Sequence, residues 1–208
     1  MFHIPLASLR AQFGDIDIYL FDQLLKGRIQ KGMQLLDAGC GTGRNIAYLM
    51  QAGVPVYGAD ISAEAIEKVR DLATEIAPTL PNKNFVVADL DALPFADEKF
   101  DVVLCSAVLH FARSEEHFKG IVRELWRTLK PGSILFARFS TTIGLEGKLQ
   151  QVEGRFYRMA HGPVWFLADE KLVIDMEREL RAERLEPLKT VLVEQDRAMT
   201  TWVVRKVA

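Results

Sequence analysis

With 208 residues the chain is long enough for one substantial hydrophobic core, so we expect a single domain over residues 1–208. Its 26 basic and 28 acidic residues give a net charge of −2, which offers no reason to expect a nucleic acid or another polyanion as partner. Two cysteines are too few for a disulfide scaffold or a zinc site, and no signal peptide or membrane-length apolar run is recognisable, so we expect a metal-free cytoplasmic protein.

Residues 1–31 form the first segment, which contains no glycine cluster that would mark a separate domain. Apolar residues at helical spacing over residues 15–29 predict a partly buried helix in it. A short apolar run over residues 33–36 has the length of a strand and stops at Asp37. We therefore expect an N-terminal helical segment that leads into the first strand of a sheet.

Three glycines that alternate with other residues follow this strand: Gly39, Gly41 and Gly43. The next residues, 44–53, predict a helix. A strand that turns through glycines into a helix leaves unpaired backbone N–H groups at the helix start, and it lets the backbone approach a ligand closely. The following strand ends at Asp60, where a carboxylate can accept hydrogen bonds from the two hydroxyls of a ribose. Together these features indicate a nucleoside-containing cofactor; a glycine turn without a ligand is the alternative.

The glycine spacing distinguishes between two kinds of cofactor. A dinucleotide fingerprint requires G-x-G-x-x-G, but Arg44 stands where its third glycine should be, which opposes a nicotinamide dehydrogenase. The pattern that begins at Asp37 is D-x-G-x-G-x-G, and it resembles the first motif of the class I S-adenosylmethionine-dependent methyltransferases. The resemblance implies S-adenosyl-L-methionine as cofactor, with Asp60 as the carboxylate that binds its ribose.

Strands and helices alternate after the glycine loop, which indicates a mostly parallel sheet covered by helices on both faces. In chain order we expect strands over residues 54–59, 84–88, 101–106, 133–139, 188–194 and 200–207, helices over 114–129 and 169–183, and a helix between its N-cap Ser62 and Pro78. The resemblance implies that the fold is α/β: a doubly wound, Rossmann-like sheet of seven strands whose last strand is antiparallel.

Further cofactor contacts are implied at the carboxyl ends of these strands. In similar methyltransferases an acid after the third strand accepts a hydrogen bond from the adenine amino group, and Asp89 stands at that place; an unrelated turn aspartate is the alternative. Cys105 lies within the fourth strand and is expected to be a small buried residue. The full set of expected cofactor-binding residues is Asp37, Gly39, Gly41, Gly43, Asp60, Ile61, Asp89, Leu90 and Ser106.

Residues 100–111, FDVVLCSAVLHF, resemble the fourth motif of small-molecule methyltransferases. They lack the Asn/Asp-Pro-Pro-Tyr/Phe tetrapeptide that methylation of amino groups on nucleic-acid bases or glutamine commonly uses. His110 stands just past the strand, where a general base would be needed if the acceptor must lose a proton, and we name it as the candidate catalytic residue. Packing beside the adenine or a hydrogen bond in the core are the alternatives for this side chain.

Residues 140–168 break the alternation of strands and helices, and long insertions of this kind are often functional. The resemblance implies that this insert helps to form the acceptor pocket, with Tyr157, Arg158, His161 and Trp165 as candidate substrate residues; a surface loop without function is the alternative. The resemblance also implies that the N-terminal helix folds over the cofactor. Tyr19 or Phe21 would then cover its methionine end, and simple core packing is the alternative.

The implied reaction is transfer of the sulfonium methyl group to a small-molecule acceptor, whose identity and accepting atom the sequence does not indicate. Two alternatives stay open: a nucleic-acid or protein methyltransferase, and a non-catalytic module that binds S-adenosylmethionine and acts through a partner. A nucleic-acid enzyme would usually show a basic face or an appended binding domain, and the sequence shows neither. The oligomeric state is not indicated.

Overall fold

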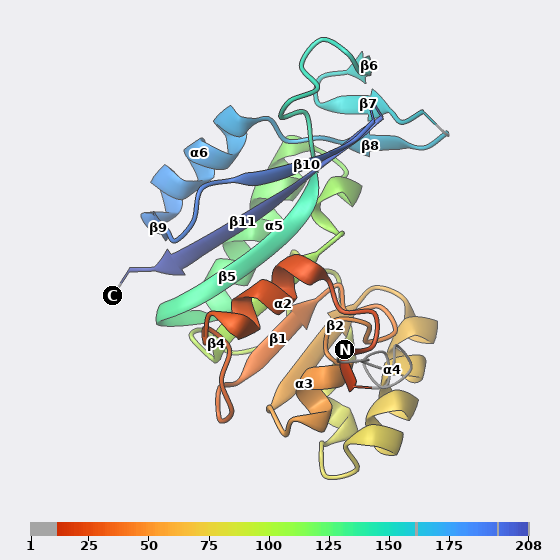
Figure 1. The fold of residues 1–208 in the computed structure, drawn as a ribbon, viewed down its shortest axis with the longest axis vertical. Coiled ribbons are helices and arrows are strands. Elements are labelled where there is room, and N and C mark those ends of the chain that lie inside the picture. Colours follow the sequence, from red (N-terminus) through yellow and green to blue (C-terminus); the bar gives the residue numbers. More distant parts are fainter. Residues whose placement is uncertain (1–11, 161, 195, 208) are drawn as a thin grey trace, which may run out of the picture.

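The computed structural model (Figure 1) describes residues 12–160, 162–194 and 196–207, so the candidate substrate residue His161 lies outside the described residues. Its central sheet contains β1 (Leu35–Ala38), β2 (Val56–Asp60), β3 (Phe85–Val87), β4 (Phe100–Ser106), β5 (Leu129–Thr141), β9 (Ala182–Arg184), β10 (Lys189–Val193) and β11 (Arg197–Lys206). Seven of these strands follow the spatial order β10-β11-β5-β4-β1-β2-β3, and the short β9 pairs with β11 beside this path.

The pairing of these strands confirms the predicted mostly parallel sheet. Strand β1 runs parallel to β2 and β4, and the parallel pairing continues from β2 to β3 and from β4 to β5. Only β11 runs against its two neighbours, β5 and β10, among the seven strands of the path. The interior strand β4 is buried along nearly its whole length, as expected for a strand with helices on both of its faces.

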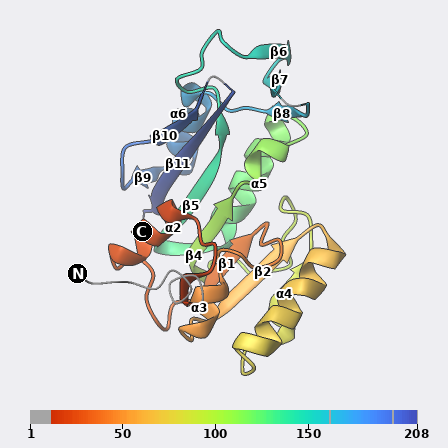
Figure 2. The ribbon, with the colours of Figure 1, turned by 45° about the vertical axis from the view of Figure 1, so that its right-hand side comes forward.

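In the described part of the chain the α-helices that cover the sheet are α2 (Ile18–Leu25), α3 (Ala47–Gln51), α4 (Ala63–Ile76), α5 (Glu115–Thr128) and α6 (Glu170–Leu180). Val102 packs in the cluster that holds residues of α2, α3 and α4, whereas its neighbour Val103 packs with α5 and α6. Successive strand residues point to opposite faces, so the two clusters lie on the two sides of the sheet, and Figures 1 and 2 show α2 and α5 on opposite sides of β4 and β5. The predicted doubly wound architecture is confirmed.

Side-chain caps define where most of these helices begin. Ser62, Ser114 and Asp169 each accept a hydrogen bond from a backbone N–H of the first turn, at the starts of α4, α5 and α6. Two helices are shorter than the apolar spacing predicts: Asp17 caps α2, and Gly43 at φ +91° keeps the chain in a turn before α3. Within the described ranges, no helix combines the length and the apolar character that a membrane span requires.

The insert after β5 has regular structure of its own. Its strands β6 (Gln150–Glu153), β7 (Phe156–Arg158) and β8 (Val164–Phe166) form a small antiparallel sheet. Arg155, in the turn before β7, donates from Nε to Glu115 (2.8 Å) and lies 2.7 Å through Nη1 from Asp169. Because these two carboxylates stand at the starts of α5 and α6, Arg155 ties the insert to the main sheet, and we interpret it as a structural residue.

Candidate functional site

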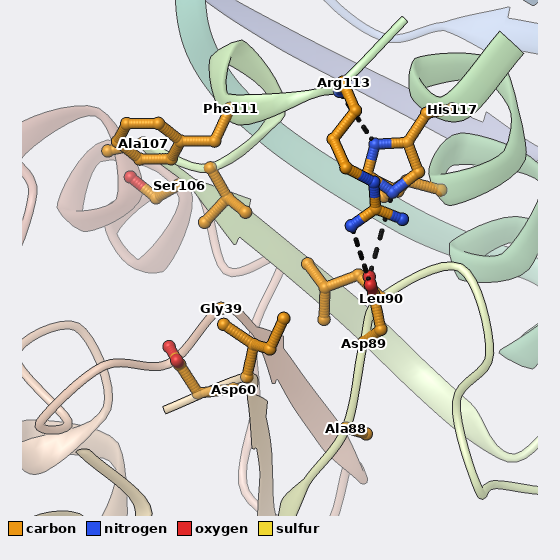
Figure 3. A pocket seen from close by; sticks show the side chains of 13 residues that line it. Gly39, Asp60, Ala88, Asp89, Leu90, Ser106, Ala107, Phe111, Arg113 and His117 are labelled. Atoms are coloured by element: carbon orange, nitrogen blue, oxygen red, sulfur yellow. Dashed lines mark hydrogen bonds and ion pairs between the residues drawn. The ribbon is translucent and has the colours of Figure 1, made fainter. Parts of the chain in front are cut away.

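A cavity of about 390 Å³ opens at the carboxyl ends of the parallel strands, between the glycine loop and the start of α5 (Figure 3). Ligands of open α/β sheets bind at this edge. Most of the sequence-predicted cofactor residues line the cavity, namely Gly39, Asp60, Ile61, Asp89, Leu90 and Ser106. Asp37, Gly41 and Gly43 do not belong to its lining. The structure thus brings together residues from four different connections of the sheet.

The three glycines of the loop have different surroundings. Gly39 has φ +80°, and a Cβ added to it would lie 2.3 Å from Cγ2 of Val108, which also lines the cavity. Gly43 has φ +91°, and a Cβ there would lie 2.9 Å from Cγ2 of Val69 in α4. A Cβ on Gly41, at φ +52°, would point into open space with respect to the described atoms. Gly39 therefore permits a close approach beside the cavity, whereas Gly43 permits close packing of α4.

Asp60 is held in a defined orientation at the end of β2. Its Oδ2 accepts a hydrogen bond from Gly41 N and its Oδ1 accepts one from Ser62 N, both at 2.9 Å. A carboxylate oxygen can accept more than one hydrogen bond, so each oxygen keeps acceptor capacity for a group in the cavity. The same carboxylate thus links the glycine loop to β2 and offers two oriented acceptors to a ligand.

Asp37 at the end of β1 is a buried acid with only 1% of its surface exposed. Neither of its oxygens has a hydrogen-bond partner among the residues that the structure describes. Burial raises the pKa of Asp37 to about 7, although the charge of Arg44 acts in the opposite direction. A buried carboxyl group without a partner is suited to a cationic group of a ligand.

His110 is buried behind the cavity and does not line it. Its Nδ1 accepts a long hydrogen bond (3.4 Å) from Ser140 N, and its ring centroid lies 4.4 Å from that of Phe111 and 4.5 Å from that of Trp165. Burial, assisted by the charge of Arg197, lowers the pKa of His110 to about 4. The imidazole is therefore neutral at pH 7 with its proton on Nε2, an arrangement that suits packing better than proton abstraction. Its catalytic role stays a prediction.

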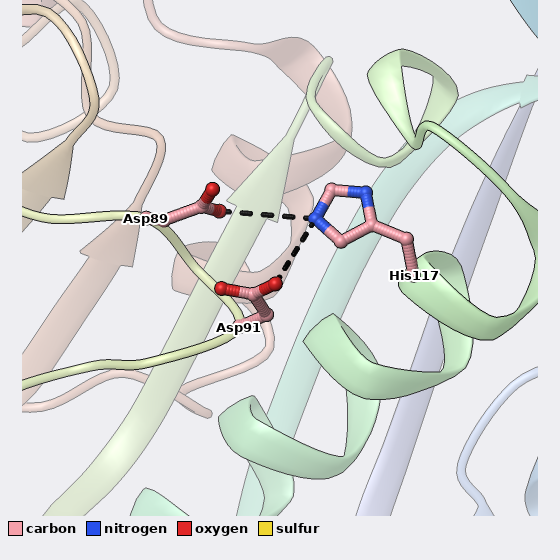
Figure 4. Close-up of side chains that lie close together, drawn as sticks. All are labelled: Asp89, Asp91 and His117. Carbon is pink, nitrogen blue, oxygen red and sulfur yellow. Dashed lines mark ion pairs between the residues drawn. The ribbon is translucent and has the colours of Figure 1, made fainter.

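Arg113 and His117 line the cavity near Asp89, and the sequence analysis did not identify them (Figures 3 and 4). Arg113 donates to Oδ2 of Asp89 at 2.9 Å and to Oδ2 of Asp91 at 3.3 Å. Burial alone would raise the pKa of Asp89, but the hydrogen bond and charge of Arg113 lower it overall. No local pattern reveals these contacts, because they join the residue before the N-cap of α5 to a turn more than 20 residues earlier in the chain.

The cluster of Asp89, Asp91 and His117 has the composition of a metal site, and its potential ligand atoms lie within 4.8 Å of one another. However, Nδ1 of His117 accepts a hydrogen bond from Arg113 N at 3.0 Å. Nδ1 is therefore the acceptor nitrogen of the ring, and Nε2, which faces Asp91 at 3.5 Å, carries the proton (Figure 4). A protonated nitrogen cannot ligate a metal, so we interpret the two aspartates as ion-pair partners of Arg113, which orients Asp89.

The insert contributes to a second cavity of about 420 Å³ between the β7–β8 hairpin and the β10–β11 hairpin. Trp165 lines this cavity, and its ring lies 5.8 Å from that of Phe111, which lines the first cavity. Tyr157 is the cross-strand partner of Trp165, while Arg158 is exposed at the end of β7. Of the three described candidate substrate residues, Trp165 thus has the position closest to both cavities.

The aromatic residues of α2 lie outside the first cavity. Tyr19 is half-buried, and the guanidinium carbon of Arg138 lies 5.0 Å from the centroid of its ring. Phe21 packs edge-on against Phe13, with 5.0 Å between ring centroids. These contacts therefore support the interpretation that both rings pack against the protein.

Comparisons with known proteins agree with this geometry. A family model described as a methyltransferase domain matches residues 36–137. The chain is 34% identical over 117 residues to the uncharacterized methyltransferase YodH of Bacillus subtilis, covering 56% of this chain and 44% of that protein. It is 30% identical over 128 residues to a malonyl-[acyl-carrier protein] O-methyltransferase of Pectobacterium atrosepticum, covering 62% and 45%. The chain thus spans less than half the length of these relatives.

Among solved structures, the chain is similar to a SAM-dependent methyltransferase from Methanosarcina mazei, with a TM-score of 0.72 and 22% sequence identity. The similarity covers 88% of this chain and 97% of that one, so it extends well beyond the segment that the family model matches. At this level of identity it establishes the fold.

Proposed function

We propose that this chain, which belongs to the class I S-adenosylmethionine-dependent methyltransferases, transfers a methyl group from S-adenosylmethionine to a small-molecule acceptor. The observation that carries the proposal is the convergence of Gly39, Asp60, Asp89 and Ser106 on one cavity at the carboxyl edge of the sheet. These residues are the ones that the family resemblance implies for the cofactor, and they come from four separate connections.

The residues of the site fit the parts of S-adenosylmethionine. Asp60 offers two oriented acceptors for the ribose hydroxyls, and the missing Cβ of Gly39 lets Val108 pack against the glycine loop without entering the cavity that both residues line. Asp89 also lines the cavity, and its carboxylate, which accepts one hydrogen bond from Arg113, would accept another from the adenine amino group. Asp37, buried without a partner in the described part of the chain, is suited to the ammonium group. Shape and charge thus agree with one ligand.

The bound cofactor would supply a methyl group that its sulfonium already activates, so the protein mainly has to align the acceptor and exclude water. We assign the acceptor side to the insert, with Trp165 as a wall between the two cavities and Tyr157 and Arg158 on the neighbouring strand. The relative that acts on a malonyl group linked to acyl-carrier protein supports an acceptor that contains a small organic group. His110 would serve as a base only for an acceptor that must lose a proton.

Single substitutions in the insert are expected to separate acceptor binding from cofactor binding. Trp165→Ala should raise the acceptor KM or lower kcat at least tenfold, because it removes the wall next to Phe111, while affinity for S-adenosylhomocysteine stays within about twofold. Tyr157→Phe and Arg158→Gln test β7 of the same small sheet, and we expect them to have smaller effects on the acceptor KM and kcat. The measurement is a methyl-transfer screen with labelled cofactor over a panel of small acceptors, followed by steady-state kinetics and calorimetry.

Arg155→Gln is the matched contrast, because Arg155 is bound to Glu115 and Asp169 and should affect stability more than acceptor binding. Wild-type kinetics in all three insert variants would remove the insert from the mechanism. If no acceptor is methylated although S-adenosylhomocysteine binds tightly, the non-catalytic binding module becomes the better interpretation and the enzyme proposal fails.

The affinity for S-adenosylmethionine is expected to rise with pH through about 7. The ammonium group of the ligand favours the ionised form of Asp37, whose pKa burial raises to about 7, so binding below that pH must release a proton. One pH unit below the pKa, affinity should be about tenfold lower than well above it. Calorimetry at pH 6 and 8, in buffers with different ionisation enthalpies, measures both the affinity and the released proton.

The control is Asp37→Asn, which keeps the shape of the side chain but cannot ionise. This variant should bind more weakly at pH 8 and lose the pH dependence between 6 and 8. A wild-type protein whose affinity is the same at both values, with no proton released, would contradict the role of Asp37.

A further inference from the structure

Four neighbouring strands carry a row of polar side chains on the face of the sheet that α2 covers; Asp37, Ser106 and Thr201 are buried, and Arg138 is half-buried. Ser106 on β4 and Thr201 on β11 are direct register partners of Arg138 on β5, so the three side chains share one face. Asp37 on β1 pairs with Leu104, two residues before Ser106, and therefore points to that face as well. Figure 1 shows α2 lying over the sheet between β5 and β1.

Each member of this row has a polar atom that lacks a hydrogen-bond partner within the described ranges: the two oxygens of Asp37, Oγ of Ser106, Nε of Arg138 and Oγ1 of Thr201. Asp37, Ser106 and Thr201 are between 1% and 7% exposed. Buried polar groups in native proteins are nearly always paired. Four adjacent exceptions on one face therefore indicate a surface that binds a polar ligand, and Ser106 connects this surface to the 390 Å³ cavity.

Arg138 is the cation of the row, and its guanidinium is already oriented. Nη1 donates to Oδ2 of Asp17 at 2.9 Å, and the guanidinium carbon lies 5.0 Å from the centroid of the Tyr19 ring. Asp17 in turn caps α2 and donates its own backbone N–H to Oδ1 of Asn45 at 3.1 Å. This leaves the edge formed by Nε and Nη2, which is the side-on donor pair that binds a carboxylate through two parallel hydrogen bonds.

We propose that the Nε–Nη2 edge of Arg138, together with the hydroxyls of Ser106 and Thr201, is a carboxylate-binding site beneath α2. The carboxylate has two possible sources: the methionyl head of the cofactor, which rests on the proposed function, or the acceptor. The row itself favours the head, because Asp37 at its other end supplies an anion for an ammonium group. An amino-acid head carries both charges, and the row offers a buried carboxyl group, Asp37, and a half-buried guanidinium, Arg138.

The site also explains why α2 lies across this part of the sheet. Asp17 uses one side of the guanidinium and keeps it from turning toward solvent, while Thr201 can donate to the second oxygen of a bound carboxylate. The backbone oxygen of Arg138 accepts from Ala107 N at 2.7 Å, so the same residue also holds the cavity-lining turn after β4. Arg138 therefore links the helix, the row and the cavity.

The test compares S-adenosylhomocysteine with its decarboxylated analogue by calorimetry on the full chain. Wild-type protein should bind S-adenosylhomocysteine at least tenfold more tightly than the analogue. Arg138→Lys keeps a charge for Asp17 but loses the paired donors, so it should lower the affinity for S-adenosylhomocysteine at least tenfold and leave the analogue unchanged. The matched control is Arg70→Lys, because Arg70 in α4 also has a buried, unpartnered Nε among the described residues but lies outside the row. It should change neither affinity.

A second arm identifies the acceptor as the source. Propionate and benzoate are titrated against the wild-type protein with and without saturating S-adenosylhomocysteine. Two results together assign the site to an acceptor carboxylate. The wild-type complex with S-adenosylhomocysteine binds propionate or benzoate and Arg138→Lys abolishes this binding, and the wild-type protein binds S-adenosylhomocysteine and its decarboxylated analogue with equal affinity. If Arg138→Lys folds with an unchanged melting temperature and alters none of these affinities, the site is refuted. Failure of S-adenosylhomocysteine to bind wild-type protein overturns the proposed function instead.

Discussion

Gly39→Val is expected to abolish cofactor binding and to destabilise the fold. Gly39 has φ +80°, a conformation that a β-branched residue rarely adopts, and its Cβ would lie 2.3 Å from Cγ2 of Val108. Left-handed strain and overpacking each cost roughly 1–3 kcal/mol, so we expect a loss of about 2–5 kcal/mol in the free energy of unfolding. Val108 would also have to move into the cavity that it lines. Chemical denaturation and calorimetry with S-adenosylhomocysteine measure the two effects.

Two control variants divide this effect into its causes. Gly41→Val shares the left-handed backbone, at φ +52°, but its Cβ meets open space among the described atoms and should cost less stability. Gly39→Ala should cost less stability in a Val108→Ala background than in the wild-type background, because the smaller side chain at position 108 relieves the contact. A folded Gly39→Val protein with normal affinity would show that the loop only turns the chain.

Asp60→Ala should lower the affinity for S-adenosylhomocysteine about ten- to a hundredfold. Hydrogen bonds to a charged group are worth roughly 1.5–3 kcal/mol, and the ribose hydroxyls would lose such a partner. The structure adds a second cause. Asp60→Ala removes the carboxylate that accepts from Gly41 N and Ser62 N, so the glycine loop loses its link to β2. The loss should therefore lie toward the upper end of this range. Calorimetric titration of the folded variant provides the measurement.

A ligand lacking the ribose 2′-hydroxyl separates the two causes. In wild-type protein this 2′-deoxy analogue should bind about tenfold more weakly than S-adenosylhomocysteine, and in Asp60→Ala the two ligands should bind equally. Asp60→Asn keeps the shape of the side chain and one acceptor oxygen, so its affinity for S-adenosylhomocysteine should lie between those of the wild-type protein and Asp60→Ala. Unchanged affinity in Asp60→Ala would remove the ribose assignment.

Much of the fold was predictable because it follows from local patterns. Ser62, Ser114 and Asp169 start helices because a short polar side chain satisfies the free N–H groups of a first turn, and that effect needs no distant residue. The D-x-G-x-G-x-G motif likewise lies in one turn, and its place after β1 puts it at the carboxyl edge of the sheet. The small sheet of the insert was not predicted, because its strands are only three or four residues long and mainly exposed.

The position of His110 shows where local patterns stop being informative. Its place after β4 predicts a candidate base, and that role is still a prediction; the structure adds that the ring packs against Phe111 and Trp165 and is not part of the lining of the first cavity. His110 lies in the short helical turn Leu109–Phe111 after β4, and its surroundings depend on Trp165, which comes more than 50 residues later in the chain. The pairing of Asp89 with Arg113 has the same origin, since α5 must pack on the sheet before the two charges meet.

Strand lengths, helix caps and glycine spacing are properties of short segments, and they were enough to predict the parallel sheet, the carboxylates at its edge and a resemblance to methyltransferases. Which polar side chains lie beside one another follows only from how the strands pair. Strand order places β4 between β1 and β5, and register then aligns Ser106, Arg138 and Thr201 on one face although they are far apart in the chain. Register depends on which strands pair, and pairing is set by the burial of the whole sheet rather than by any one segment.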